Sequence, residues 1–330
     1  MILPAFRLHQ PASIDEALTL AASCGNDYDF LGGGTDLLPN YKNRLNPRGN
    51  VIALWRVREL REVGDRSFGA MSRLSGLETA PAVRKRYPAL VEAIQEVATP
   101  LVRQQATLGG NLLVETRCYY FNQSPDWRAA KGYCMKADGD VCLVVPQKEI
   151  CYAVYSGDTA AVLLAMDAVL AIHGPAGPRE VKAREFFQPD GIRKNVLHRG
   201  EILARITLPP QAEHYRAGYL KLRLRDSYDF PDAGVAAALR LDGETVVDLQ
   251  VAVSAVSMTP LLFTSVTEPM KGERLTADLI AHVAKEVAVK TQPVRNVMFP
   301  PQYRKKMVGL YTRRLLTRLA GLPQSGTQTP

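Results

Sequence analysis

Four of the five cysteines in this chain of 330 residues stand within one short stretch. Consecutive members of the group are separated by 15, 7 and 8 residues. A segment this long without helix or strand periodicity needs a function or a core of its own. We therefore predict a loop at about residues 116–154 that is inserted into a cofactor-binding domain and built around these cysteines. The four are Cys118, Cys134, Cys142 and Cys151.

Four clustered cysteines can form two disulfides, bind a zinc ion or ligate an iron–sulfur cluster. Disulfides belong mainly to oxidising compartments, and the N-terminal sequence has no pattern of a secretory signal. Structural zinc sites usually contain one tightly spaced cysteine pair, whereas these spacings are all wide. An iron–sulfur cluster takes four thiolates and accepts wide spacing when they lie on one folded loop. The residues by themselves leave all three open and favour the iron–sulfur cluster.

Composition restricts the class of protein. A chain of this length is expected to form two or three domains. Its apolar stretches are too short for a membrane span, so we expect a cytoplasmic protein. The net charge of +8 would suit nucleic acid, but the basic residues are scattered and match no nucleic-acid-binding motif. The five histidines are isolated, and no Ser-His-Asp pattern predicts a nucleophile.

Three segments differ in their patterns. Residues 1–58 predict a β–α–β unit, with Ser13 as the N-cap of its helix. Residues 59–214 mix strands with helices and contain the cysteine loop. Residues 215–322 alternate apolar and polar positions like an antiparallel sheet and then give two amphipathic helices. Residues 323–330 are expected to form a disordered tail. This order predicts an α+β fold.

Two glycine-rich turns are candidates for anion binding. Gly32-Gly33-Gly34-Thr35-Asp36 follows a short strand, and Thr107-Leu108-Gly109-Gly110-Asn111 precedes the cysteine loop. Consecutive glycines let backbone N–H groups converge on anionic oxygens, and a helix that starts there adds its positive end. A tight strand-to-helix turn explains one such motif equally well. The presence of two such turns predicts that they bind one diphosphate group from two sides.

Two charged residues have both a structural and a functional interpretation. Asp158 stands at the start of a predicted helix, where it would act as a cap or accept hydrogen bonds from a cofactor. Lys221 recurs with Arg223 and Arg225 at period 2 on one strand face. That face is either solvated or supplies a cationic contact to a cofactor.

These motifs together resemble those of a known family. GGGTDLL at 32–38, TLGGNL at 107–112 and Gly157-Asp158 are similar to the FAD-binding medium subunits of the molybdenum hydroxylases, the xanthine dehydrogenase family. The loop that begins TRCYYFNQS at 116–124 resembles the loop that carries a 4Fe–4S cluster in the β subunit of 4-hydroxybenzoyl-CoA reductases. The resemblance runs along essentially the whole chain.

The resemblance implies a two-part FAD-binding domain of the PCMH-like type, a C-terminal sheet-and-helix domain and a place in an αβγ heterotrimer that pairs into a dimer. The large subunit would hold molybdenum and the substrate, and the small one two 2Fe–2S clusters. Electrons from a ferredoxin would pass through the 4Fe–4S cluster and FAD, so no residue of this chain is expected to be catalytic. The four cysteines would ligate the cluster. The residues expected to bind FAD are Leu31, Gly32, Gly33, Gly34, Thr35, Asp36, Leu37, Thr107, Gly109, Gly110, Asn111, Asp158 and Lys221.

Two other functions compete with this expectation. In the first alternative, the chain is the FAD subunit of a molybdenum aldehyde or N-heterocycle oxidoreductase, in which electrons leave through FAD. A metal- or nucleic-acid-binding protein without flavin would account for the charge and the thiols alone. The residues around Cys118 favour the reductase among the three.

Overall fold

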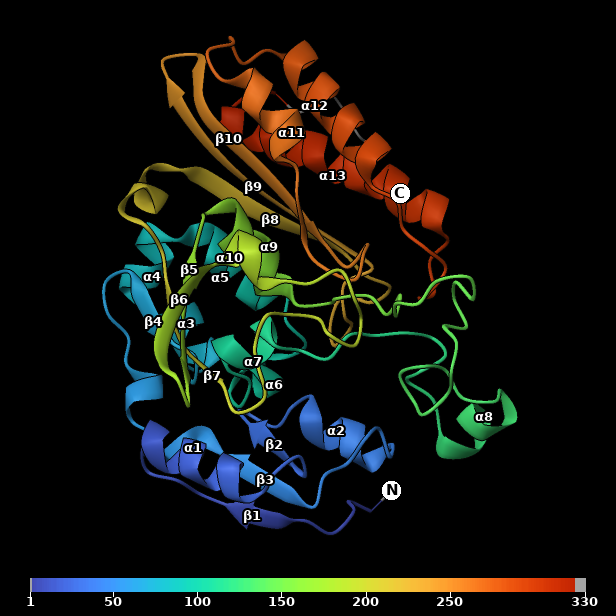
Figure 1. The fold of residues 1–330 in the computed structure, drawn as a ribbon. Helices are drawn as coiled ribbons and strands as arrows, with labels where there is room; N and C mark the ends of the chain where they lie inside the picture. The colour runs from blue at the N-terminus through green and yellow to red at the C-terminus, as the bar shows by residue number, and fades with distance from the viewer. Residues whose placement is uncertain (1, 324–330) are drawn as a thin grey trace.

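The computed structural model describes residues 2–323, and within them the strands form three separate sheets. The N-terminal sheet, the middle sheet and the C-terminal sheet follow one another along the molecule, and a lobe that contains α8 projects from the side (Figure 1). The predicted α+β class is confirmed. Residues 324–330, most of the predicted tail, lie outside the described residues.

The N-terminal unit is a parallel sheet of order β1-β3-β2 with two helices. Ser13 caps the first helix as predicted, because its Oγ accepts a hydrogen bond from the backbone N–H of Glu16 at 3.2 Å. The apolar stretch 51–57 is not one strand, since its strand ends at Ala53 and residues 54–56 turn into a 3₁₀-helix. The elements are β1 (Arg7–His9), α1 (Ile14–Ser23), β2 (Tyr28–Leu31), α2 (Leu37–Lys42), β3 (Asn50–Ala53) and η1 (Leu54–Arg56).

The middle unit is an antiparallel sheet of order β4-β7-β5-β6 with helices on it. Pro81 and Pro88 each occupy the first turn of a new helix, a position that needs no N–H donor. The elements are η2 (Glu59–Arg61), β4 (Ser67–Gly69), α3 (Leu74–Thr79), α4 (Pro81–Arg86), α5 (Pro88–Gln95), α6 (Pro100–Arg103), α7 (Leu108–Leu112), α9 (Asp158–Ala165), β5 (Val169–Gly174), β6 (Gly177–Lys182), α10 (Ala183–Phe186), β7 (Ile202–Thr207) and η3 (Pro210–His214).

The C-terminal unit is the antiparallel sheet β11-β10-β9-β8 that the period-2 pattern predicted. Its two long helices pack on one face, and the all-buried helix α9 packs against the same sheet from the middle unit. A helix that is apolar all round has to be buried, so α9 fixes the C-terminal unit to the middle one. The elements are β8 (Arg216–Leu222), β9 (Ala233–Asp242), β10 (Thr245–Ser254), β11 (Leu261–Leu262), α11 (Thr264–Thr267), η4 (Glu268–Met270), α12 (Ala277–Lys290) and α13 (Pro301–Ala320).

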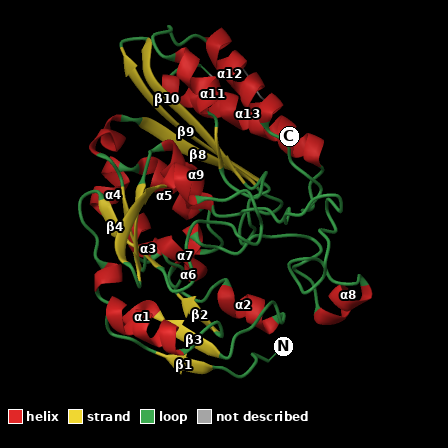
Figure 2. Cartoon of the chain, viewed as in Figure 1, coloured by secondary structure: helices red, strands yellow, loops and turns green. Residues whose placement is uncertain are grey.

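The cysteine loop forms the projecting lobe, which is drawn almost entirely as loop in Figure 2 apart from α8 (Pro125–Ala130). At its base, Arg117 and Val154 exchange two backbone hydrogen bonds of 2.7 Å each. Arg128 of α8 donates to the carbonyl oxygens of Asn43 and Arg44 and so ties the lobe to the N-terminal unit. The lobe has a small apolar core of its own, which contains Phe121 and three of its cysteines.

Candidate functional site

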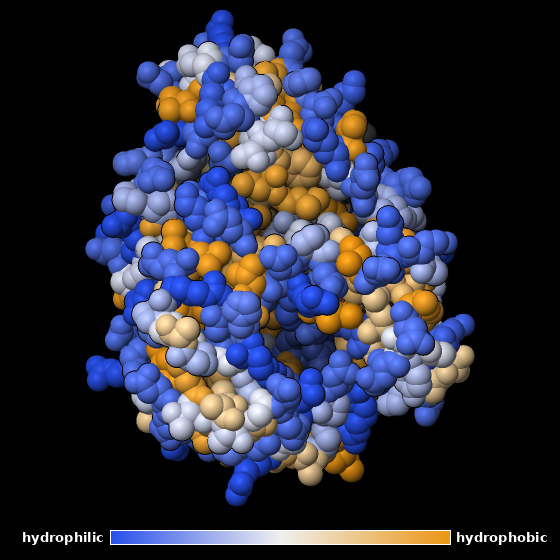
Figure 3. Space-filling view, viewed as in Figure 1, coloured by the Kyte–Doolittle hydropathy of each residue, from blue (hydrophilic) through white to orange (hydrophobic). Residues whose placement is uncertain are grey.

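The main cleft of the described chain lies where α2, α7 and the lobe meet. Its volume is about 450 Å³, within the range of small-molecule and cofactor sites. The molecule is hollowed at its centre on the face shown in Figure 3, with hydrophilic side chains at the recess. Every cofactor residue predicted from the two glycine-rich turns lines this cleft: Leu31, Gly32, Gly33, Gly34, Thr35, Asp36, Leu37, Thr107, Gly109, Gly110 and Asn111.

The first glycine-rich turn presents open backbone donors to the cleft. Within residues 2–323, no backbone hydrogen bond engages the N–H groups of Gly33, Gly34 or Thr35. A Cβ at position 33 would lie 1.9 Å from the carbonyl oxygen of Gln105, and Gly34 has a φ of +77° that other residues rarely adopt. The turn therefore needs glycine, and its N–H groups fit the diphosphate oxygens of a dinucleotide.

The second turn differs from the open nest that the sequence predicted. Thr107 caps the short helix α7, and its Oγ1 accepts from the N–H of Gly110 at 3.1 Å. The N–H of Gly109 donates to Ala70 O and that of Asn111 to Thr107 O. Because these donors are already paired, the turn contributes close packing instead: a Cβ on Gly109 would lie 2.6 Å from that of Ala70.

Asp158 and Lys221 form a buried ion pair on the C-terminal side of the middle unit, 3.1 Å apart. The cap interpretation of Asp158 is wrong, since Gly157 is the N-cap and the Asp158 carboxylate accepts instead from Tyr219 Oη and Lys221 Nζ. Burial raises the pKa of Asp158, and these partners offset the rise only partly. The solvated-face interpretation of Lys221 is also wrong, since its side chain is fully buried.

The same pair is separate from the cleft. Lys221 Nζ also donates hydrogen bonds to the carbonyl oxygens of Glu96 (2.7 Å) and Asp229 (2.8 Å). Neither Asp158 nor Lys221 lines the cleft. Their contact with the cofactor therefore stays a prediction.

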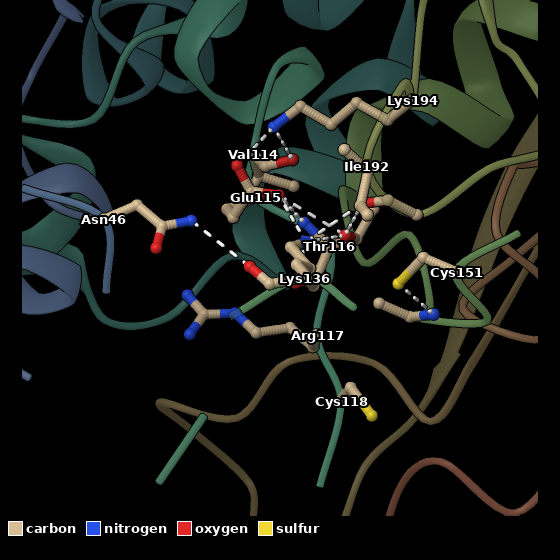
Figure 4. Close-up of polar contacts among 12 residues, drawn as sticks. Asn46, Val114, Glu115, Thr116, Arg117, Cys118, Lys136, Cys151, Ile192 and Lys194 are labelled. Atoms are coloured by element: carbon tan, nitrogen blue, oxygen red, sulfur yellow. Dashed lines mark hydrogen bonds and ion pairs between the residues drawn. The ribbon is translucent and has the colours of Figure 1, made fainter. Parts of the chain in front are cut away.

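Glu115 stands between two lysines on the wall of the cleft. Its Oε1 accepts from Lys136 of the lobe at 2.6 Å, and its Oε2 accepts from Lys194 at 3.0 Å, as Figure 4 shows. Burial alone would raise the pKa of this carboxyl, but the two ammonium groups hold it well below its ordinary range. These three side chains together carry one net positive charge, and the two lysines hold the carboxylate in place.

Asp36 connects the first glycine-rich turn to the start of the lobe. Its carboxylate accepts from the N–H of Glu115 at 3.0 Å and pairs with the guanidinium of Arg117. That guanidinium lies 4.0 Å from the ring centre of Phe230, which also lines the cleft. Asp36 therefore joins the first glycine-rich turn to residues 115–117, which lead to the base of the lobe.

The structure buries all four clustered cysteines as free thiols, so the disulfide alternative is not realised in it. The pKa of Cys118 is raised to about 11 and that of Cys151 to about 12, mainly by burial, and the neighbouring Cys142 contributes to both rises. The N–H groups of Tyr120 and Phe121 point at the sulfur of Cys118. Across residues 2–323, however, no three His, Cys, Asp or Glu side chains converge closely enough to hold a metal ion.

The donor set nevertheless fits an iron–sulfur cluster. The lobe buries four thiols, three of them in its apolar core, and N–H groups aimed at sulfur stabilise thiolate ligands and tune a cluster. Thiols with a raised pKa stay protonated and inert at neutral pH, so a metal would have to displace their protons into solvent. Ligation of a cluster by Cys118, Cys134, Cys142 and Cys151 stays a prediction.

Asn296 braces the lobe from the C-terminal unit. Its backbone oxygen accepts from the N–H of Tyr119 at 2.9 Å, and its Nδ2 donates to Tyr152 O at 2.6 Å. These neighbours directly follow Cys118 and Cys151. Asn296 is itself held by Arg304, a fully buried side chain whose pKa burial lowers to about 10.

Sequence reasoning missed several residues of the site. Glu115, Lys136, Lys194 and Phe230 all line the cleft, yet they belong to no motif. Lys136 offered one usable signal, because it is a charged residue between two clustered cysteines in a loop predicted to have its own core. Asn296 offered none, since its partners in the lobe are 144 and more residues away in sequence.

Comparison with known proteins identifies the architecture. A family profile for the FAD binding domain in molybdopterin dehydrogenase matches residues 4–211, and one for the CO dehydrogenase flavoprotein C-terminal domain matches residues 218–319. The chain belongs to the FAD-binding medium subunits of the molybdenum hydroxylases. The resemblance predicted from the glycine motifs is confirmed at the level of this family.

Individual members of the family match over most of the chain. The carbon monoxide dehydrogenase medium chain of Hydrogenophaga pseudoflava is 28% identical over 320 residues, which are 96% of this chain and 97% of that protein. The aldehyde oxidoreductase FAD-binding subunit of Escherichia coli is 33% identical over 230 residues, which are 65% and 71% of the two chains. A solved structure of the carbon monoxide dehydrogenase from Hydrogenophaga pseudoflava superposes with a TM-score of 0.78 at 27% identity, covering 96% and 98%.

Family membership gives the cleft its ligand. An FAD-binding domain of this family spans both glycine-rich turns, and the open N–H groups of the first turn together with the glycines that admit close approach fit the dinucleotide. None of the helices in the described part of the chain is long and apolar enough to cross a membrane.

Proposed function

We propose that this chain is the FAD-binding electron-transfer subunit of a molybdenum-dependent oxidoreductase that acts on an aldehyde or an N-heterocycle, and that its lobe carries a 4Fe–4S cluster. The open N–H groups of Gly33, Gly34 and Thr35 beside an FAD-family cleft carry the flavin part of this proposal. The similarity of 33% to an aldehyde oxidoreductase subunit supports the substrate class.

The residues of this chain bind and position, and none acts on the substrate. A bound flavin supplies electron transfer in steps of one or two, and a cluster supplies single-electron transfer. Gly33 and Gly34 would hold the diphosphate, and Asn111 is kept in the cleft wall by two hydrogen bonds from Thr159. Cys118, Cys134, Cys142 and Cys151 would ligate the cluster. The substrate site would lie in a molybdenum-containing large subunit, beside a small subunit with two 2Fe–2S clusters.

A 4-hydroxybenzoyl-CoA reductase with a ferredoxin donor is the second candidate. One observation favours it: the sequence TRCYYFNQS around Cys118, which resembles the cluster loop of that enzyme. The relatives described above are named for carbon monoxide and aldehyde, and they move the aldehyde or heterocycle function ahead of the reductase expected from the sequence.

The test uses the complete complex, purified without oxygen. Metal and flavin analysis should give one FAD and about four irons for this chain in addition to those of the small subunit. Turnover is then measured with a panel of aldehydes, N-heterocycles and 4-hydroxybenzoyl-CoA. Oxidation of an aldehyde or heterocycle supports the proposal, and reduction of 4-hydroxybenzoyl-CoA alone would replace it with the second candidate. Absence of flavin would contradict both.

A further inference from the structure

Lys136 belongs to two sites at once. In sequence it lies in the lobe, between Cys134 and Cys142. In space its side chain, only 6% exposed, reaches into the wall of the flavin cleft. Figure 4 shows its ammonium group meeting Glu115 and Thr116, which come from the segment that follows α7. Lys136 is therefore a lobe residue that forms part of the cofactor site.

The ammonium group of Lys136 is fixed in place. Nζ donates to Glu115 Oε1 at 2.6 Å, to Gly191 O at 2.9 Å and to Thr116 O at 3.2 Å, and it also contacts Thr116 Oγ1. An ammonium group has three protons, so these acceptors use all of them. The ring centre of Phe121 lies 4.7 Å away on another side.

The backbone of Lys136 is equally fixed to a cysteine. The carbonyl oxygen of Cys134 accepts from the N–H of Ala137 at 2.7 Å and from that of Gly139 at 3.0 Å. Lys136 therefore lies inside a tight turn that begins at Cys134. A shift of Cys134 must move the Lys136 backbone, and the ammonium group with it.

Lys136 also sets the charge of the group that it forms with Glu115 and Lys194. Without it, Glu115 and Lys194 would form a neutral pair 3.0 Å apart. With it, the group carries one net positive charge on the surface that faces an anionic dinucleotide. Opposite charges attract most strongly where water is partly excluded, and Glu115 is only about a third exposed (34%).

We propose that Lys136 is a positioning residue shared by the cysteine lobe and the flavin cleft: metal bound by the four cysteines holds its ammonium group in the cleft wall and so strengthens FAD binding. This inference rests on the cluster of the proposed function. Because such coupling is reciprocal, bound FAD should in turn strengthen retention of the metal. A lobe that only covers the cluster would show no such coupling.

The experiment measures FAD dissociation from the intact complex, by the fluorescence of released flavin, before and after the lobe iron is removed with a chelator. Three variants are compared with the wild type. K136M removes the ammonium group, E115Q removes its anchor while the lobe sequence stays unchanged, and K131M makes the same change as K136M at an exposed lobe position. The Lys131 side chain is exposed, and its Nζ lies 5.6 Å from the ring centre of Trp127. Iron content is followed in every sample.

Loss of lobe iron should weaken FAD binding of the wild type and of K131M by about 5- to 150-fold, the usual range of coupling between two sites. In K136M and E115Q the affinity for FAD should no longer change when the iron is removed, because neither variant keeps an ammonium group held by Glu115, and both should lose iron faster than K131M. If K136M fails to assemble, E115Q carries the test by itself.

Two results overturn the inference in different ways. If the wild type contains no lobe iron at all, the cluster of the proposed function fails and the inference falls with it. If the iron is present but its removal leaves FAD dissociation unchanged, or K136M responds as the wild type does, the cluster stands and the inference alone is wrong.

Discussion

The replacement of Gly33 by alanine tests the assignment of the cleft most directly. A Cβ at this position would lie 1.9 Å from the oxygen and 2.6 Å from the carbonyl carbon of Gln105. Both contacts are backbone atoms, so no flexible side chain can move aside. An ordinary contact of a Cβ begins near 3.4 Å, and the two segments must therefore separate by about 1.5 Å, a shift of the size that overpacked cores resist.

The magnitude follows from that separation. Overpacking of this kind costs about 1–3 kcal/mol. If this cost acts wholly on the FAD-bound state, the affinity for FAD falls roughly 5- to 150-fold. Gly33 lines the cleft, and Gln105 precedes Ala106, which lines it too. The loss should therefore appear in FAD affinity first. The part that acts on the free protein should lower the melting temperature by about 2–4 °C for each kcal/mol.

The assay compares G33A with G76A in the assembled complex, by flavin content after gel filtration and by thermal unfolding. Gly76 is a matched control, because it is exposed within α3 and an added Cβ there meets nothing within 4 Å. Alanine at that position should stabilise the helix by about 0.5–1 kcal/mol and leave flavin bound. A G33A complex with full flavin and an unchanged melting temperature would refute the reasoning.

Three further predictions concern buried polar groups. D158A leaves the ammonium of Lys221 buried without its carboxylate, which should lower the free energy of unfolding by about 3–5 kcal/mol in urea; a D158A/K221M chain as unstable as D158A would argue against this. The lowered pKa of Glu115 adds stability that is complete above its unfolded pKa of about 4.3 and lost as pH falls below it, so E115Q should show a shallower acid dependence of unfolding than the wild type. Y155F deletes the 2.8 Å hydrogen bond to Leu112 O and should cost about 1–2 kcal/mol, read from the denaturant midpoint with an unchanged slope.

Local chemistry made much of the fold predictable. Ser13 caps its helix, and Pro81 and Pro88 begin theirs, because each effect acts within a single turn of chain. The glycine-rich turn at 32–36 was predictable for the same reason: no other residue type tolerates its backbone and its close contacts. The period-2 pattern after residue 215 is likewise a local consequence of the pleat.

The remainder depends on contacts between distant segments. Asp158 looked like a helix cap because its partner Lys221 lies 63 residues later, and Lys221 looked solvated because nothing near it in sequence shows that α9 covers that strand. The second turn looked like an open nest because nothing near it in sequence shows that Ala70 O accepts from the N–H of Gly109. Lys136 and its partner Glu115 are 21 residues apart in sequence. The chain between them is irregular apart from α8, so no periodic pattern relates the two.

The brace at Asn296 has a consequence for how the protein is made. A ribosome completes all four cysteines long before residue 296, and the Arg304 side chain that holds Asn296 follows later still. Until then the segments after Cys118 and Cys151 lack the two hydrogen bonds that hold them to the C-terminal unit. We therefore expect the lobe to gain this brace only when α13 docks. A chain that stops before Arg304 would keep every thiol and lose the brace.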